Sequence, residues 1–103
     1  MFHIDTEYLE GLLNRVGKRV FLEYYFQFKS LSQPHVSNAD IVDIIVENFT
    51  LKSKQSRTSK AKRIFNEGLH LNALALIIES QHPQIEMLKP KAKQILRNEL
   101  NIA

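Results

Sequence analysis

Residues 52–63, KSKQSRTSKAKR, are the part of the chain whose residue types most clearly suggest binding chemistry. This segment holds six basic residues and no acid, out of 14 Lys and Arg and 11 Asp and Glu in the whole chain. The rest of the chain therefore carries 8 basic and 11 acidic residues, so a mildly acidic body bears one positive segment. Such a local field governs binding more than the net charge of +3 does.

The other reactive residue types are scattered. The chain has no Cys, and its four His are not paired at the spacing of a metal site. Asp40, Asp43 and Glu47 have the spacing of one helix face, but an oxygen cage for a hard cation needs more ligands, so a solvated acidic face is expected. With no phosphate-binding glycine loop and no nucleophile motif, we expect no enzyme, no cofactor and no metal.

Five aromatic residues gather near residue 25 and allow two interpretations. They are Phe21, Tyr24, Tyr25, Phe26 and Phe28. Rings of this kind can stack on nucleobases, but five large side chains in a small domain more often form its core. We expect a core, with Tyr25 or Phe26 at the contact of a possible homodimer.

The elements that would position the basic segment are helices. At 103 residues the chain is expected to be a single all-α domain (residues 1–103), a compact bundle of five or six helices. The expected helices cover residues 6–14, 18–29, 38–48, 55–67 and 69–80, with a last one from Pro83 that Pro90 kinks or restarts. Gly17 and Gly68 are expected helix ends, Ser37 or Asn38 an N-cap, and residues 50–54 a connection.

Residues 18–29, KRVFLEYYFQFK, fit two kinds of element. Their apolar residues alternate as in a strand, and they also fit one face of a helix. No second segment alternates cleanly enough to pair with such a strand. We predict a helix, and the alternative is a strand that pairs across a homodimer axis.

The expected helix 55–67 has an apolar inner face and a polar outer face. Ala61, Ile64 and Phe65 form the inner face at 100° per residue. The outer face combines amides, hydroxyls and guanidinium groups, which pair with base edges, and the flanking lysines suit phosphates. The predicted nucleic-acid-binding residues are Lys52, Lys54, Gln55, Arg57, Ser59, Lys60, Lys62, Arg63 and Asn66.

Residues 37–68 resemble the helix-turn-helix class of DNA-binding motifs. A capped apolar helix is followed by a connection and by a basic helix with an apolar inner face. The segment 49–54 lacks the glycine often found in the tight form of the motif, and the connection is longer than usual. The acidic face of the first helix would have to point away from a duplex.

We therefore expect a small sequence-reading or accessory DNA-binding protein, such as a transcription regulator, with residues 55–67 as recognition helix. Basic residues in a first helical turn oppose the macrodipole, which indicates a role other than stability. The alternative is a helical protein-interaction module, an adaptor, inhibitor or assembly subunit that docks an acidic partner. We expect no signal peptide, no membrane contact and a cytoplasmic location.

Overall fold

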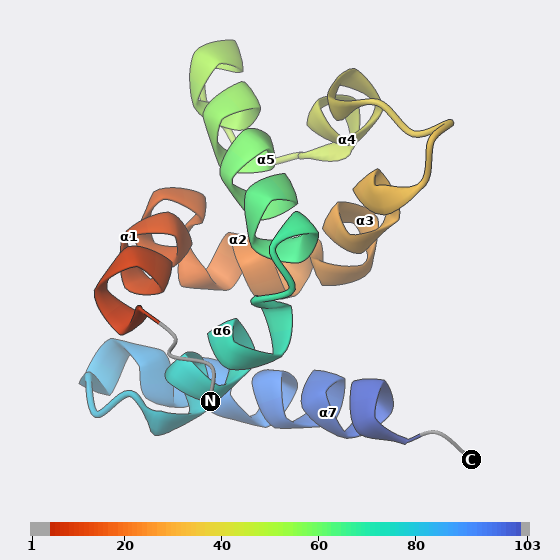
Figure 1. Cartoon of the computed structure of the whole chain (residues 1–103). Helices are drawn as coiled ribbons and strands as arrows, with labels where there is room; N and C mark the ends of the chain where they lie inside the picture. The colour runs from red at the N-terminus through yellow and green to blue at the C-terminus, as the bar shows by residue number, and fades with distance from the viewer. Residues whose placement is uncertain (1–4, 102–103) are drawn as a thin grey trace.

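The computed structural model describes residues 5–101, and this part of the chain is helical without any strand (Figure 1). It contains seven α-helices and two 3-10 segments around one connected apolar core. They are α1 (Thr6–Val16), α2 (Lys18–Glu23), α3 (Tyr25–Lys29), η1 (Ser30–Ser32), α4 (Asn38–Ile44), α5 (Leu51–Asn66), α6 (His70–Glu79), η2 (Pro83–Leu88) and α7 (Lys89–Leu100). The all-α prediction is confirmed. The α-helices outnumber the expected five or six because the predicted helix 18–29 is divided into α2 and α3.

Helix α1 begins and ends at the residues that its sequence indicates. The Asp5 carboxylate accepts a hydrogen bond from the Tyr8 N–H at 3.1 Å and caps the first turn. Gly17 ends the helix with a φ of 91°, which only glycine adopts without strain. The chain then turns directly into α2.

Residues 18–29 form helices α2 and α3, which meet at Tyr24, so the strand alternative is wrong. Phe21, Tyr25 and Phe28 recur at steps of three and four residues and are almost completely buried. The prediction that the aromatic residues form a core is confirmed for these three and for Tyr24. Phe26 is the exception, because half of its surface remains exposed.

Helix α4 is shorter than predicted and ends at Ile44 instead of about Asn48. Ser37 and Asp40 cap its start in a reciprocal pair of hydrogen bonds, at 3.2 and 2.9 Å. Its end is fixed by Tyr24, a residue from the junction of α2 and α3. The Tyr24 hydroxyl accepts a hydrogen bond from the Val46 N–H at 3.1 Å and donates one to Glu47 at 2.6 Å. These bonds hold residues 46 and 47 outside the helix.

Helix α5 begins four residues earlier than predicted. Thr50 caps it by accepting a hydrogen bond from the Ser53 N–H at 3.1 Å, so residues 51–54 are helical and not a connection. Its end follows the prediction at Gly68, where φ is 70° and the Gly68 and Leu69 amides bond back to Phe65 and Ile64. The first turns of α5 project beyond α1 and α4 in Figure 1.

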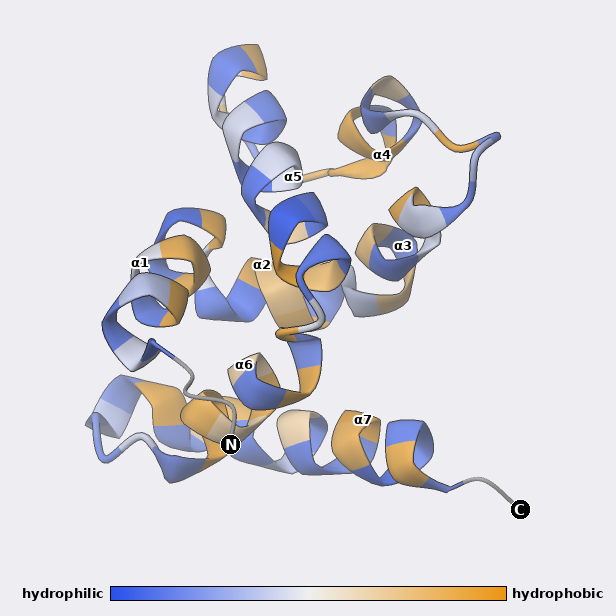
Figure 2. Cartoon of the chain, viewed as in Figure 1, coloured by the Kyte–Doolittle hydropathy of each residue, from blue (hydrophilic) through white to orange (hydrophobic). Residues whose placement is uncertain are grey.

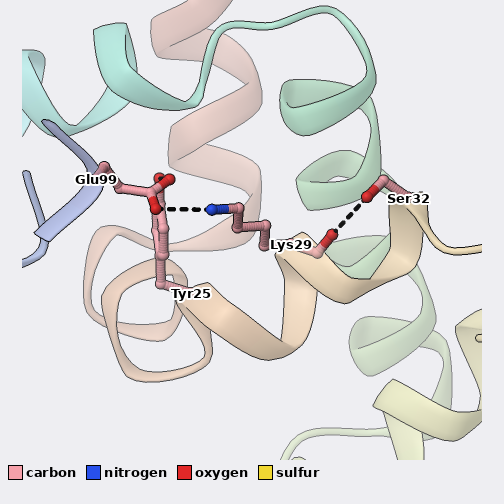
Figure 3. Close-up of polar contacts among 4 residues, drawn as sticks. All are labelled: Tyr25, Lys29, Ser32 and Glu99. Atoms are coloured by element: carbon pink, nitrogen blue, oxygen red, sulfur yellow. Dashed lines mark hydrogen bonds and ion pairs between the residues drawn. The ribbon is translucent and has the colours of Figure 1, made fainter. Parts of the chain in front are cut away.

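The C-terminal third packs against one end of α5. Pro90 restarts the chain as α7 after the 3-10 segment η2, as one of the two expected outcomes. The partly buried carboxylate of Glu99 joins α7 to α3, because it accepts hydrogen bonds from Lys29 at 2.7 Å and from Tyr25 at 2.9 Å (Figure 3). Although burial opposes it, these two donors hold the pKa of Glu99 below its usual value.

Candidate nucleic-acid interface

Helix α5 divides the predicted binding residues into an exposed and a partly buried group. Thr58, Ala61 and Ile64 are buried and define the inner side of the helix. The outer face of α5, as we use the term, consists of the exposed residues Lys52, Gln55, Ser59, Arg63 and Asn66. The partly buried group is Lys54, Arg57, Lys60 and Lys62. Figure 2 shows the projecting part of α5 mostly in the blue and pale colours of polar residues.

Two of the partly buried cations bind the protein's own backbone. The Lys54 ammonium donates to the Ile45 carbonyl at 2.8 Å, across the connection between α4 and α5. The Arg57 guanidinium donates through Nη1 to the Val16 carbonyl at 2.7 Å and through Nε to Ser53 Oγ at 3.0 Å. Its centre also lies 3.8 Å from the centroid of the Phe49 ring. Lys54 and Arg57 therefore hold α5 in place.

The C-terminal end of the outer face is partly neutralised. The Tyr8 hydroxyl on α1 donates to both oxygens of Glu67, at 3.0 and 2.9 Å. The bond to Glu67 raises the pKa of Tyr8, and the nearby Arg63 guanidinium opposes this rise. Arg63 thus lies close to a carboxylate and a phenol, whereas Lys52 at the other end of the face has no acidic neighbour of this kind within the described residues.

The three acids predicted to share one face of the first helix do not do so. Asp40 belongs to the cap of α4, where hydrogen bonds with Ser37 lower its pKa. Glu47 lies beyond the end of α4 and accepts the hydroxyl of Tyr24. Asp43 is exposed like Asp40, but it takes no part in the cap of α4. The expected acidic face is therefore wrong, because α4 stops at Ile44.

The two sides of the outer face differ in chemistry. On the α4 side, a hollow of about 420 Å³ brings Asp43 together with Gln55 and Ser59. Its other walls are Asn38, Ala39, Val42 and the exposed Leu51. We call it the α4–α5 hollow. The resemblance to a helix-turn-helix motif requires the acidic side chains of the first helix to point away from a duplex. Asp43 does not meet this requirement, because it lies beside the outer face of α5.

On the α1 side, the chain forms what we call the basic hollow, with a volume of about 290 Å³. Its lining residues are Arg15, Thr50, Lys52, Ser53, Ser56 and Arg57. Arg15 was not among the predicted site residues. The sequence does contain a signal for it, since residues 14–19 read NRVGKR and hold three of the eight basic residues outside the segment 52–63.

A larger hollow adjoins Arg57 at the corner between α1 and α2. This corner hollow measures about 650 Å³, and its lining is mainly apolar. Phe49, Ile85, Met87 and Leu88 contribute the apolar surface, while Lys18 and Arg19 contribute charge. Met87 is 80% exposed here. The hollow combines an apolar surface with cations, which suits an amphipathic anionic ligand.

The described residues form neither a metal cluster nor a membrane-spanning helix. In residues 5–101 no three His, Cys, Asp or Glu side chains gather as metal ligands. His3 lies outside the described residues, and His70 stacks on Phe65 with the ring centroids 5.0 Å apart. Within the same range, no helix has both the length and the apolar character to cross a bilayer.

The structural features that bear on function are therefore helix α5 and the α4–α5 and basic hollows on either side of it. Comparison of the chain with models of protein families, with curated proteins and with solved structures finds no match.

Proposed function

We propose that the protein binds duplex DNA through the outer face of α5, as a small sequence-reading or accessory protein. In this proposal α4, the connection and α5 act as a helix-turn-helix-like unit (residues 37–68), and α5 is the recognition helix. One observation carries the proposal. A 16-residue helix with six cations and no acid projects from a body that is otherwise mildly acidic.

The residues of the outer face have the groups that distinguish base pairs. Arginine pairs with guanine, glutamine and asparagine pair with adenine, and serine pairs with several bases. Gln55, Ser59, Arg63 and Asn66 supply these groups along one side of the helix. Lys52, Lys60 and Lys62 supply the charge that phosphates require. Lys54 and Arg57 contribute mainly by fixing the helix against α1 and the connection.

Duplex binding measured over a range of salt concentrations tests this proposal. If Lys52, Lys60 and Lys62 each neutralise a phosphate, log K falls with log salt at a slope of about −2.7. Arg63→Ala weakens a preferred sequence more than random DNA, and Lys52→Ala weakens both alike. Lys93→Ala, an exposed lysine of α7, is the control and changes neither. Flat salt dependence, or no binding to mixed duplex at low salt, refutes the proposal.

A second candidate function, docking of an acidic protein partner, is favoured by the corner hollow. Its apolar lining with Lys18 and Arg19 suits an acidic amphipathic helix. This function predicts purified protein without nucleic acid, with the absorbance ratio at 260 and 280 nm of a protein alone. It also predicts that Met87→Glu, which places a carboxylate in the corner hollow, weakens binding of an acidic amphipathic peptide. Nucleic acid retained through purification counts against it.

A further inference from the structure

The basic hollow brings together cations from two helices that lie apart in the sequence. Arg15 comes from the last turn of α1, and Lys52 and Arg57 come from the first turns of α5. The other lining residues, Thr50, Ser53 and Ser56, all carry hydroxyl groups. Among the described residues no acid and no aromatic ring lines it. The hollow therefore offers positive charge and hydrogen-bond donors and no surface for stacking.

The charges of this hollow are not balanced within the protein. Arg15 and Lys52 are exposed, and the ion pairs of the described residues involve Lys29, Lys89 and Lys91 instead. Of the three cations that line the basic hollow, Arg57 is the one whose side chain is held by contacts within the protein. Its contacts with Val16, Ser53 and Phe49 set the position of its guanidinium before any ligand arrives. A preorganised charge loses little conformational entropy when it binds an anion.

We propose that the basic hollow holds a backbone phosphate of the duplex that α5 contacts, with Arg15 as a phosphate contact from outside α5. This proposal rests on the proposed function. Three cations and three hydroxyl groups match the charge and the several acceptor oxygens of a phosphodiester. The volume of about 290 Å³ leaves room for the adjoining sugar. In this arrangement the DNA backbone runs along the side of the outer face that carries the basic hollow. The α4–α5 hollow, on the other side, faces the bases.

Arg15 and Arg97 form a matched pair for the test. Each is an exposed arginine in the last turn of its helix, where a cation compensates the helix macrodipole equally well. Only Arg15 lines the basic hollow. Any effect that follows from charge or helix stability alone is therefore expected in both variants.

The first experiment measures duplex binding of the full chain at several salt concentrations. One lost phosphate contact lowers the magnitude of the salt slope by about 0.9, which corresponds to an affinity about 8-fold weaker at 0.1 M salt. Arg15→Ala is expected to show this loss equally on preferred and random duplex, Arg15→Lys to retain most of the affinity, and Arg97→Ala to match the wild type. If Arg15→Ala and Arg97→Ala behave alike while Arg63→Ala still weakens binding, the proposal is overturned and the proposed function stands.

A second experiment measures anion binding at the basic hollow in the absence of DNA. Inorganic phosphate is titrated into the wild type and Arg15→Ala, and the backbone amide signals of Ser53 and Ser56 are followed by NMR. Arg15-dependent shifts, together with competition by phosphate against duplex, support the proposal. Arg15-dependent shifts in a protein that binds no duplex overturn the nucleic-acid assignment and the proposed function, and leave a site for free phosphate. Polyglutamate that binds as tightly as duplex, also through Arg15, assigns the hollow to an acidic protein and overturns the proposal.

Discussion

Replacing Arg57 by alanine should destabilise the fold itself, although Arg57 belongs to the segment that sequence reasoning assigns to DNA. Its guanidinium joins the end of α1 to α5 through the Val16 carbonyl, and it covers the Phe49 ring. Val16 is completely buried, so without Arg57 its carbonyl, at the end of α1, loses a charged donor.

The expected loss follows from these contacts. A hydrogen bond to a charged group contributes about 1.5–3 kcal/mol, and a cation over an aromatic ring contributes about 0.5–1 kcal/mol at a partly exposed site. The bond to Ser53 joins two residues of the same helix and is left out of the sum. Arg57→Ala should therefore lower the free energy of unfolding by about 3 kcal/mol. Arg57→Lys keeps the charge but not the planar fork, and should lose about half as much.

Urea denaturation followed by circular dichroism measures this effect. With an m value of about 1.5 kcal/mol/M, the Arg57→Ala midpoint should fall by about 2 M. Arg63→Ala, which removes the same charge from the outer face, should stay within about 0.5 kcal/mol of the wild type. If Arg57→Ala and Arg63→Ala have the same midpoint, the contacts of Arg57 do not stabilise the fold, and the reasoning is refuted.

Three further substitutions test the core and its titrating groups. Thr58 is buried, and its hydroxyl has no hydrogen-bond partner among the described residues. Thr58→Val should therefore raise the unfolding free energy by about 1 kcal/mol. An unchanged thermal midpoint would contradict this prediction. Burial lowers the pKa of His70, so the unfolded chain takes up a proton first and wild-type stability should fall as the pH drops below 6.5. His70→Phe, which preserves the ring contact with Phe65, should reduce that fall between pH 7.5 and 5.5, and an equal fall in both proteins would refute the assignment. Because the pKa of Glu99 is depressed, Glu99→Gln should be destabilising at pH 7. The difference in unfolding free energy between the variant and the wild type should shrink as the pH falls below 4.5. A constant difference down to pH 3 would exclude the charged pair with Lys29 as its cause.

Helix ends that depend on neighbouring residues could be predicted from the sequence. The cap at Ser37, the turn at Gly68 and the restart at Pro90 each need a side chain or a backbone angle that a single residue supplies. The aromatic core was predictable for a similar reason, since few other places in a small domain can bury such large rings.

Contacts between distant residues could not be predicted in this way. The hydroxyl of Tyr24 holds residues 46 and 47 and so ends α4 early, although the helical pattern continues to Phe49. The start of α5 was missed because Leu51 in its first turn is exposed and adds nothing to the apolar inner face. Arg57 bonds to a carbonyl on another helix, and no local pattern marks such a partner.

The same contact between α1 and α5 restricts how related sequences can vary. A Cβ atom at Gly17 would lie 2.8 Å from Nη1 of Arg57, and the φ of Gly17 already disfavours any other residue. A side chain at position 17 would therefore strain the backbone and would also displace the Arg57 guanidinium from the Val16 carbonyl. Homologous chains should change the two positions together, so that Arg57 is found with glycine at 17, and a larger residue at 17 only where residue 57 is short and the end of α1 is rebuilt.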